Sequence, residues 1–446
     1  MSVVSKRNEK NGQPDLAKKL TSKKARIGII GLGYVGLPLA VALAAENFRI
    51  TGIDLNAQKV KRVNTGDSYI SDVDGVRLTD VVENKRLSAT TDFNKLANLD
   101  VVVICVPTPI SQSKAPDLSY VVRATEDVSR YIHKGQLIIL ESTTYPGTTE
   151  EVVLPLLAQS GLTVGKDFYL AFSPERVDPG NKNFLLRNTP KVIGGVTPKC
   201  TKMASLLYSS VADEIITVSS PEVAETTKLF ENVFRNVNIA LVNELTVLCH
   251  KMGISAYEVI EAASTKPFGF MRFNPGPGVG GHCIPVDPYY LAAKAKEYDF
   301  HSKFIESAGE VNENMPYFVV ELIAEALNQR GKPTKGSKVL ILGVAYKKNI
   351  NDVRETPAVR VIKSLKEKGA TVIYNDPFVE TLHVNGTSMV SKALTKQLLN
   401  SADCTVILTN HSVYNYTDVV QQSQLVVDTR AATKDIKDCR NKIIRF

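Results

Sequence analysis

The chain has 446 residues, of which 43% are hydrophobic and 22% are charged. This length exceeds what a single hydrophobic core supports, and the composition is that of a globular protein, so the sequence predicts several domains. The sequence shows no apolar run near the roughly 20 residues of a membrane helix and no apolar core of a secretory signal, so we expect a cytoplasmic protein with no membrane partner.

The net charge of +8 is concentrated at the N-terminus. Residues 1–24 contain seven Lys or Arg and two Asp or Glu, a net charge of +5, so the remaining 422 residues carry only +3. We interpret residues 1–24 as a disordered basic leader, and we expect no nucleic-acid partner. A mildly basic body suits an anionic small substrate.

The six cysteines are scattered along the chain without a C-x-x-C pair. This pattern argues against a disulfide scaffold and against a structural zinc site, so no metal is expected. Cys105 falls in an apolar run and is interpreted as a small buried hydrophobic residue. Cys283 has a different neighbourhood, because four glycines lie within the eight residues before it.

Residues 25–218 alternate between short β-rich runs and helical segments, such as the Ala- and Leu-rich residues 37–46. Strands are predicted at residues 26–30, 49–53, 101–106, 136–141, 169–172 and 191–193. Alternating strands and helices are typical of a parallel sheet covered on both faces. We therefore predict a Rossmann-like nucleotide-binding domain over residues 25–218.

Residues 219–330 change to a helical pattern. After Ser220-Pro221, a good helix start, the sequence runs for some 30 residues without Gly or Pro until Gly253. A helix of this length spans roughly 45 Å and would connect domains or form a dimer interface. More helix is expected at residues 289–296 and 306–329.

Residues 331–446 return to the alternating pattern and predict a second Rossmann-like domain. Strands are expected at residues 338–343, 371–376, 405–409 and 425–428, with a helix at 358–368. The segment Gly343-Val-Ala-Tyr-Lys is not a complete glycine fingerprint. This domain would bind a nucleotide other than NAD or have a purely structural role.

The fingerprint Gly31-Leu-Gly33-Tyr-Val-Gly36 follows a predicted strand and begins a helix, and Asp54 ends the next strand. In this context the glycines allow a tight turn and close approach to a pyrophosphate at the helix N-terminus. Asp54 can accept hydrogen bonds from the adenosine ribose and would repel a 2′-phosphate. The cofactor is therefore predicted to be NAD, and Lys59 lies close enough in sequence to contact it.

Cys283 is the predicted nucleophile, because glycine-rich backbone lets a thiol approach a bound molecule. Asp287, four residues later, can handle protons. His282 either lowers the thiol pKa or shapes the substrate site. A buried structural cysteine is the alternative.

Lys228 and Asn232 are spaced i, i+4 on the long helix, so they share a face and could stabilise an oxyanion. A solvated helix face is the alternative for this pair. Glu175 follows a predicted strand and is either a general base or a surface carboxylate.

Together these residues resemble the UDP-glucose/GDP-mannose dehydrogenase family, over nearly the whole chain from about residue 24 to residue 440. The motifs that carry the resemblance are Gly31-x-Gly33-x-x-Gly36, Val106-Pro-Thr-Pro109, Glu141-Ser-Thr-Thr144 leading to Pro146-Gly147, Phe172-Ser-Pro-Glu175, Lys228-x-x-x-Asn232, Gly280-Gly-His-Cys283-x-x-x-Asp287, and Lys347 with Arg354. The resemblance implies two Rossmann-like doubly wound domains joined by a long central helix. It also implies a homodimer, or a larger dimer-based assembly, formed across that helical region.

The resemblance also implies residue roles, with the active site between the domains. The implied cofactor-binding residues are Gly31, Gly33, Tyr34, Val35, Gly36, Asp54, Lys59, Pro107, Thr108, Thr143 and Arg354. The implied substrate-binding residues are Glu175, Arg176, Val177, Lys228, Asn232, Arg272, Asn274, Gly276, Gly278, Gly280, His282, Tyr346 and Lys347. The implied catalytic residues are Cys283, Lys228, Asn232, Asp287, Glu175 and Thr143.

The implied reaction is a four-electron oxidation of a UDP-sugar C6 alcohol to a carboxylate, with two NAD reduced and a thioester formed on Cys283. The segments around Glu175, Arg272 and His282 resemble the branch that oxidises UDP-N-acetylhexosamines. Ile284-Pro285 favours UDP-N-acetylglucosamine over UDP-N-acetylmannosamine, with UDP-glucose as a further alternative. The product would serve capsule, O-antigen or other surface-polysaccharide synthesis.

Two rival interpretations are a two-electron NAD-dependent hydroxyacid dehydrogenase, which needs no cysteine, and a non-catalytic nucleotide-sugar sensor. Two, one or no NADH per sugar consumed would separate the three.

Overall fold

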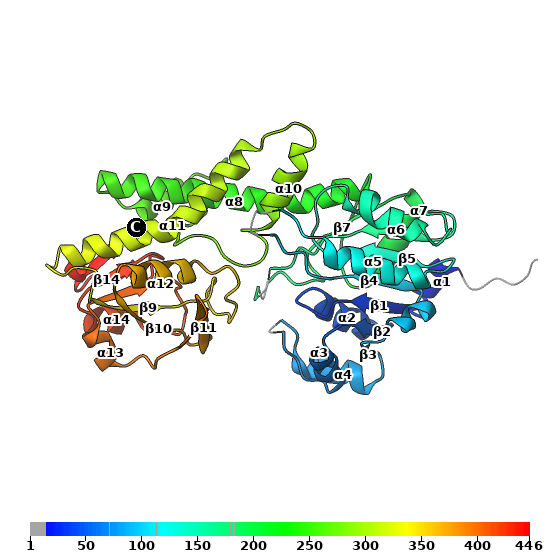
Figure 1. Cartoon of the computed structure of the whole chain (residues 1–446), viewed down its shortest axis with the longest axis horizontal. Helices are drawn as coiled ribbons and strands as arrows, with labels where there is room; N and C mark the ends of the chain where they lie inside the picture. Colours follow the sequence, from blue (N-terminus) through cyan, green and yellow to red (C-terminus); the bar gives the residue numbers. More distant parts are fainter. Residues whose placement is uncertain (1–14, 71, 112–114, 179, 182) are drawn as a thin grey trace, which may run out of the picture. The chain divides into compact units, whose positions relative to one another are not determined.

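The computed structural model describes residues 15–70, 72–111, 115–178, 180–181 and 183–446. The chain divides into two compact units, residues 1–230 and 231–446 (Figure 1). Among the described residues, no helix combines the length and apolar character that crossing a bilayer requires.

The N-terminal unit contains an eight-stranded sheet in the order β3-β2-β1-β4-β5-β6-β7-β8. Its strands are β1 (Arg26–Ile30), β2 (Arg49–Ile53), β3 (Leu87–Thr90), β4 (Val101–Ile104), β5 (Leu137–Leu140), β6 (Tyr169–Phe172), β7 (Lys191–Gly195) and β8 (Ile215–Val218). All neighbours are parallel except β6 and β7. The predicted doubly wound sheet is confirmed, with one antiparallel pair that was not expected.

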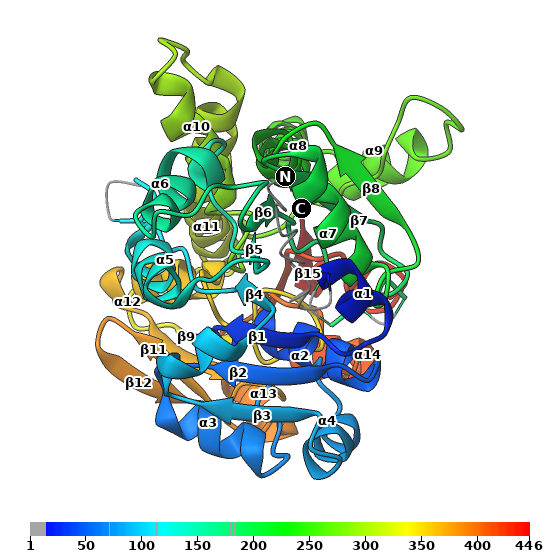
Figure 2. The same ribbon diagram turned by 90° about the vertical axis from the view of Figure 1, so that its right-hand side faces the viewer.

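Helices cover both faces of this sheet, because its central strands are apolar on both sides. Ile27 and Ile29 point into one core with α2 (Gly36–Ala45), α4 (Gly75–Glu83) and α7 (Pro198–Tyr208). Val102 and Ile104 point into the other core with α5 (Ser119–Tyr131) and α6 (Leu154–Ala158). Figure 2 shows α5 and α6 on one side of β4 and β5, and α7 on the other. Helix α3 (Ala57–Asn64) follows β2, and the short helices η1 (Phe93–Asn98) and η2 (Thr149–Val153) complete the unit.

The expected leader is partly folded. Residues 1–14 lie outside the described residues, but helix α1 (Leu16–Thr21) lies within the segment 1–24 that we expected to be disordered. Leu16 and Leu20 are buried in the core of the first sheet, and Lys19 Nζ pairs with Asp100 at 2.6 Å. The expectation is wrong for this stretch, because two leucines four residues apart give one helix face enough apolar surface to dock.

Helix α8 (Pro221–Met252) confirms the long central helix, beginning in the first unit and ending in the second. It is followed by α9 (Ala256–Ala263), α10 (Asp287–Lys296) and α11 (Lys303–Asn328). The predicted helices at 289–296 and 306–329 correspond to α10 and α11. Between α9 and α10 the chain has no regular element, and this segment contains Cys283.

The C-terminal unit contains a five-stranded parallel sheet in the order β10-β9-β13-β14-β15. Its strands are β9 (Lys338–Leu342), β10 (Thr371–Asn375), β13 (Cys404–Ile407), β14 (Val426–Asp428) and β15 (Ile443–Arg445), with η3 (Arg440–Lys442) before the last strand. A separate hairpin, β11 (Thr381–Val384) and β12 (Thr387–Val390), was not predicted. The predicted second Rossmann-like sheet is confirmed.

Both faces of the second sheet are also covered. Val339 and Ile341 pack into a core with α11 and α12 (Pro357–Glu367). Leu340 and Leu342 pack with α13 (Lys396–Ser401) and α14 (Tyr416–Gln422). Figure 1 shows α12 next to β9, and α13 and α14 at the other side of the sheet. In each unit the carboxyl ends of the strands therefore face loops that can form a site.

Candidate active site

The glycine fingerprint forms a cradle at the carboxyl end of β1. Gly31 has φ +94°, and a Cβ there would lie 2.5 Å from the Cys105 carbonyl oxygen. A Cβ on Gly36 would lie 1.9 Å from the Gly31 carbonyl oxygen, so a side chain would prevent α2 from packing against the turn. A Cβ on Gly33 would meet nothing within 4 Å. This open side, at a helix N-terminus, fits the pyrophosphate of a dinucleotide.

Asp54 lies beside this cradle, at the end of β2. Its Oδ2 accepts a hydrogen bond from the Leu32 backbone N–H at 2.9 Å, and its Oδ1 accepts one from Asn56 at 2.9 Å. The side chain is 12% exposed, and Lys59 Nζ lies 3.7 Å from Oδ2. The carboxylate is held in place yet accessible, as a ribose-binding acid requires. Predicted residues Pro107 and Thr108 follow β4, the neighbour of β1 across the point where strand order reverses.

The loop after β5 carries predicted residue Thr143, which is half-buried. Its neighbour Thr144 is only 1% exposed, and its hydroxyl makes no hydrogen bond to any described residue. A buried hydroxyl without a partner is costly unless a ligand supplies one. Thr144 is therefore a candidate ligand-binding residue that the sequence reasoning missed. A Thr-Thr pair gives no sequence signal as to which hydroxyl is used.

The same loop is fixed to the first turns of α8 by Glu225. Its Oε2 accepts the Gly147 N–H at 2.6 Å, and its Oε1 accepts the Thr149 N–H at 2.9 Å and hydroxyl at 2.7 Å. Burial raises the pKa of Glu225 to about 7, although these three donors oppose the rise. Lys228 is on the same helix, three residues later, and is also buried.

Glu175 is held from both sides of its carboxylate. Oε1 accepts the backbone N–H groups of Arg176 at 2.7 Å and Val177 at 2.6 Å, and Oε2 accepts from Lys191 Nζ at 3.2 Å. Burial favours a higher pKa, but Lys191 and the two amides outweigh it and lower the pKa of Glu175. The group therefore stays ionised and is better suited to orient a water molecule than to take its proton.

Lys191 is a second residue that the sequence reasoning missed. It is 2% exposed at the start of β7 and also donates to Glu141, which accepts from the Tyr208 hydroxyl at 2.7 Å. A buried lysine with two carboxylate partners is a satisfied arrangement, and losing one partner would be costly. The available sequence signal was a charged residue at the start of an otherwise apolar strand.

In the C-terminal unit, Cys283 lies between a glycine-rich loop and the start of α10. The Asp287 backbone N–H donates to the Cys283 carbonyl at 2.8 Å, closing a helical turn. One donor atom from each of His282, Cys283 and Asp287 lies within 4.8 Å of the others. A group with these donors has the chemistry to hold a metal ion, but it equally places an imidazole and a carboxylate beside a thiol for proton transfer.

Asp287 is fully buried, and its Oδ2 accepts a hydrogen bond from Asn232 Nδ2 at 2.5 Å. Asn232 lies one turn after Lys228 on α8, and both are 8% exposed. This burial rejects the solvated-face alternative for the pair. The structure thus brings Asn232 to Asp287 and Cys283 within the second unit.

The loop that carries Cys283 packs against the turn after β9. A Cβ on Gly280 would lie 2.6 Å from Tyr346 Cβ, and one on Gly281 would lie 3.0 Å from the Tyr346 ring. Gly281 N–H also donates to the Arg354 carbonyl at 2.9 Å. The Arg354 guanidinium is held by Asp352, with Nη2 donating to Oδ2 at 2.6 Å. Tyr346 and Arg354 therefore lie beside the loop that carries Cys283, and the half-buried Lys347 follows Tyr346.

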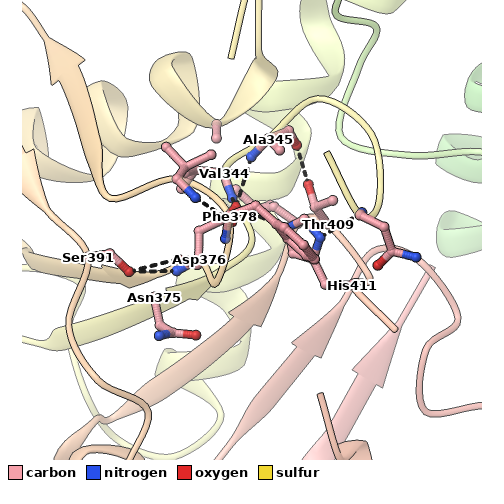
Figure 3. A network of polar contacts seen from close by, with 12 residues as sticks. Val344, Ala345, Asn375, Asp376, Phe378, Ser391, Thr409 and His411 are labelled. Carbon is pink, nitrogen blue, oxygen red and sulfur yellow. Dashed lines mark hydrogen bonds and ion pairs between the residues drawn. The ribbon is translucent and has the colours of Figure 1, made fainter. Parts of the chain in front are cut away.

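A network behind this turn holds it in place (Figure 3). Asp376 Oδ2 accepts from the backbone N–H groups of Val344 at 2.7 Å and Ala345 at 3.1 Å. His411 Nε2 lies 3.0 Å from the same oxygen, and its Nδ1 accepts from the Asn349 N–H at 2.9 Å. The residues on both sides of Lys347 are thus anchored.

Arg430 is a third residue that the sequence reasoning missed. It follows β14, and a Cβ on Gly276 would lie 2.4 Å from its Nη1. Its Nε donates to the Leu408 carbonyl at 2.9 Å, but its terminal nitrogens donate to no acceptor among the described residues. Burial lowers the pKa of Arg430. A guanidinium held this way at the strand ends can bind an anionic or carbonyl oxygen; Asp428-x-Arg430 after a strand was the available signal.

Two of the predicted substrate-binding residues, Arg272 and Asn274, contact each other. Arg272 Nε donates to Asn274 Oδ1 at 3.1 Å, and Arg272 Nη2 lies 3.6 Å from Glu261. Both residues are exposed. Arg176 donates to the Pro190 carbonyl at 2.7 Å. The predicted residues fall into two sets, one in each unit.

Models of known families match the chain in three segments. The NAD binding domain of the UDP-glucose/GDP-mannose dehydrogenase family matches residues 25–212, the central domain of that family matches residues 222–314, and its UDP binding domain matches residues 340–435.

Individual relatives agree. The UDP-N-acetyl-D-glucosamine 6-dehydrogenase of Pseudomonas aeruginosa is 38% identical over 377 residues, covering 82% of this chain and 87% of the relative. The UDP-N-acetyl-D-mannosamine dehydrogenase of Pyrococcus horikoshii is 36% identical over 416 residues, covering 92% and 96%. A solved structure of the Pyrococcus horikoshii UDP-D-ManNAc dehydrogenase superposes with a TM-score of 0.86 at 35% identity, covering 94% of this chain and 98% of that chain. The chain therefore belongs to the UDP-glucose/GDP-mannose dehydrogenase family.

Proposed function

We propose that this protein oxidises the C6 alcohol of a UDP-N-acetylhexosamine to a carboxylate in two NAD-dependent steps, with UDP-N-acetylglucosamine as the first-choice substrate. The observation that carries the proposal is the position of Cys283, with donor atoms of His282 and Asp287 within 4.8 Å and Asn232 bonded to Asp287. A two-electron hydroxyacid dehydrogenase has no use for such a thiol.

NAD fits the first unit, since Gly33 leaves the cradle open and Asp54 is accessible to a ribose. When bound there, the nicotinamide supplies the hydride acceptor. Gly31 and Gly36 shape the turn, and Asp54 selects against a 2′-phosphate by charge repulsion. The Thr144 hydroxyl is buried and has no hydrogen-bond partner among the described residues, which supports a role in bonding a reacting oxygen or a water molecule.

The covalent steps form and then break one C–S bond, at the Cys283 sulfur. The alcohol first loses a hydride and a proton and becomes an aldehyde, with Asp287 as the proton acceptor through a water molecule. The Cys283 thiol adds to the aldehyde and forms a thiohemiacetal, which loses a second hydride and proton to give a thioester. Water then cleaves the C–S bond, releasing the carboxylate and restoring the thiol. The covalent link keeps a reactive aldehyde from escaping.

The charged groups have separate tasks in this scheme. Lys228 and Asn232, one turn apart on α8, stabilise the oxyanions of the two sulfur adducts. Glu175, kept ionised by Lys191, orients the water that cleaves the thioester. In the UDP-binding unit, Tyr346, Lys347 and Arg430 bind the nucleotide part of the substrate.

UDP-N-acetylmannosamine is the second candidate substrate. It is favoured by the relative from Pyrococcus horikoshii, which shares 36% identity over more of this chain than the relative named for the glucosamine sugar. UDP-glucose is a third candidate, since the family also includes enzymes acting on it. The two acetylated sugars differ only in configuration at C2, so a direct assay must decide.

We also propose a homodimer through α8. Several large apolar side chains are exposed along this helix: Phe234 at 43%, Leu241 at 64% and Leu248 at 52%. Their spacing of seven residues puts them on one stripe, which suits packing against the same stripe of a second copy. The cytoplasmic location and a role in surface-polysaccharide synthesis remain predictions from the sequence.

The decisive test is the Cys283→Ser variant with each of the four sugars UDP-N-acetylglucosamine, UDP-N-acetylmannosamine, UDP-N-acetylgalactosamine and UDP-glucose. Wild type should form two NADH per sugar consumed, and Cys283→Ser should lose carboxylate formation by at least about 100-fold. Cys439→Ser, a half-buried cysteine near the C-terminus, is the matched control. Undiminished carboxylate formation by Cys283→Ser would overturn the proposal.

A further inference from the structure

A chain of three buried asparagines runs from α8 to the loop that carries Cys283. The Gly276 backbone N–H donates to Asn243 Oδ1 at 3.0 Å. Asn243 Nδ2 donates to Asn312 Oδ1 at 2.8 Å, and Asn312 Nδ2 donates to Asn236 Oδ1 at 2.7 Å. The donors and acceptors alternate along the chain. Asn243 and Asn312 each accept one hydrogen bond with the side-chain oxygen and donate the next one with the side-chain nitrogen.

Burial makes this chain energetically sensitive. Asn243, Asn312 and Asn236 are 0%, 2% and 3% exposed. A buried amide costs free energy unless it is hydrogen-bonded, whereas a satisfied buried network rigidifies the groups it connects. An apolar residue at any one of these positions would leave a neighbouring buried donor or acceptor without its partner. The amides therefore point to a requirement for a defined position of the loop.

The stripe of α8 that carries these residues holds both ends of the loop. Asn236 lies one turn after Asn232, and Asn243 lies a further seven residues on, so all three share a face. Asn232 bonds Asp287 at the distal end, and Asn243 bonds Gly276 at the proximal end. The segment between them contains Gly276, Gly278, Gly280 and Gly281.

Glycine-rich backbone has a large conformational freedom, and this freedom must be removed before a thiol can be aimed at a substrate. One other hydrogen bond assists, because the Tyr257 hydroxyl donates to the Pro275 carbonyl at 3.0 Å. The backbone of Gly278 also packs closely, since a Cβ there would lie 3.1 Å from the Asn312 carbonyl oxygen. The asparagine chain links the proximal end of the loop by hydrogen bonds to the helix that also carries Asn232, and Phe234 of the same helix contacts Phe273 just before the loop, with ring centroids 5.9 Å apart.

We propose that Asn243 and Asn312 are positioning residues for Cys283, acting through the Gly276 backbone. They need not touch substrate. The catalytic part of this inference rests on the proposed role of Cys283, whereas the structural part, ordering of residues 276–287, does not.

The test is a graded series, Asn243→Ala, Asn312→Ala and Asn236→Ala. Amide hydrogen exchange of residues 276–287, measured without substrate, should accelerate most in Asn243→Ala and least in Asn236→Ala. The reason is that, of the three asparagines, Asn243 is the one that accepts a hydrogen bond from the loop backbone, whereas Asn236 is two bonds away from it. The kcat/KM for the UDP-sugar should fall in the same order, by roughly 10- to 100-fold for Asn243→Ala. Affinity for NAD, which binds in the first unit, should stay unchanged.

Val319→Ala is the matched control, because Val319 is fully buried in the apolar core on α11 and its truncation also destabilises the unit. Comparison is made at temperatures where each variant is folded. The inference is overturned if loop exchange and kcat/KM in the asparagine variants change no more than in Val319→Ala, or if the three variants show no gradation. If exchange follows the gradation and Cys283→Ser remains fully active, the positioning stands and the proposed function fails. Asn236→Ala, furthest from the loop, keeps the series informative if Asn243→Ala does not fold.

Discussion

The two sheets of this protein begin alike and diverge directly after their first strand. Strand β1 leads into Gly31-Leu-Gly33-Tyr-Val-Gly36, and β9 leads into Gly343-Val-Ala345-Tyr-Lys-Lys348. The first glycine has the same role in both, with φ +94° at Gly31 and +77° at Gly343. A Cβ would lie 2.5 or 2.4 Å from a carbonyl oxygen just after the neighbouring strand. The second and third glycines are present only in the first sheet.

The acids that follow the second strand of each unit, Asp54 after β2 and Asp376 after β10, differ even more in burial and in hydrogen bonding. Asp54 uses its carboxylate on two backbone N–H groups and stays 12% exposed. Asp376 accepts from five donors, including His411, and its side chain is fully buried (Figure 3). The same position in the same fold is thus accessible to a ligand in one sheet and enclosed as internal support in the other.

The comparison shows how a duplicated architecture acquires different ligands. In the first sheet the crevice where strand order reverses is left open at Gly33 and is bordered by a helix N-terminus. In the second sheet the buried His411 follows β13 and bonds Asp376 after β10, and the chain runs 13 residues beyond Gly343 before α12 begins at Pro357. A dinucleotide has no cradle there, whereas the turn bearing Tyr346 and Lys347 gains a rigid support.

The largest expected effect is loss of stability in Asp376→Ala. Five donors would lose their acceptor inside the fold, so the free energy of unfolding should fall by about 4 kcal/mol or more. Asp54→Ala, the equivalent change in the first sheet, should cost less, about 1 kcal/mol, because only two backbone N–H groups lose their acceptor and water can reach this site. Denaturant unfolding of both variants measures the difference, and equal losses would show that the two acids have the same role.

The pH dependence of stability should have opposite signs in the two units. The pKa of Glu225 is raised to about 7, so its contribution is complete below its ordinary value of 4.5 and is lost as pH rises through 7. Between pH 5 and 7 wild type should lose roughly 2 kcal/mol relative to Glu225→Gln. Hydrogen bonds from His411 and backbone amides overcome burial and lower the pKa of Asp376, so its contribution is present above 3.8 and is lost as pH falls below that value.

Unfolding free energies of wild type, Glu225→Gln and Asp376→Asn, measured from pH 3 to 8, test these signs. Glu222→Gln, which removes an exposed carboxylate in the first turn of α8, should keep the wild-type loss of stability both between pH 5 and 7 and below pH 3.8. If the unfolding free energy of wild type changed with pH in the same way as that of Glu225→Gln between pH 5 and 7, the raised pKa of the buried Glu225 carboxyl would be contradicted.

The smallest expected effect concerns cofactor affinity. Asp54→Ala should weaken NAD binding by about tenfold, since one charge-assisted hydrogen-bond acceptor for the ribose is lost. The preference for NAD over NADP should narrow as well, because the repulsive charge is gone. Calorimetric titration with each cofactor measures both, with Asp376→Asn as the control that leaves NAD affinity unchanged. Unaltered NAD affinity in Asp54→Ala would remove this residue from the cofactor site.

Much of the fold could be predicted because its signals are local. Apolar runs of four to six residues marked the strands, and the absence of Gly and Pro marked α8. Leu16 and Leu20 were missed since their apolar character matters only once a core is available to receive them. The antiparallel β7 and the hairpin β11–β12 were missed because strand direction and pairing are set by partners far away in sequence.

The candidate site divides in the same way. Gly31, Asp54, Lys228, Asn232, Cys283 and Asp287 could be selected because each lies in a short pattern whose chemistry depends on nearby residues. Three other residues could not be selected: Lys191, Thr144 and Arg430. Lys191 matters through its burial and a partner 16 residues away, whereas the Thr144 hydroxyl and the Arg430 terminal nitrogens have no hydrogen-bond partner within the part of the chain that the structure describes.

The sequence by itself determined the fold class and the dinucleotide-binding fingerprint, and it singled out Cys283 as the predicted nucleophile, because these depend on glycine placement, strand and helix periodicity and a single side chain. Only the tertiary structure decided which of two similar acids is open to a ligand and which is enclosed. It also revealed that the loop bearing Cys283 is tied to α8 through buried amides. The physical reason is that exposure and hydrogen-bond satisfaction are properties of the packed chain, and no local pattern of residues encodes them.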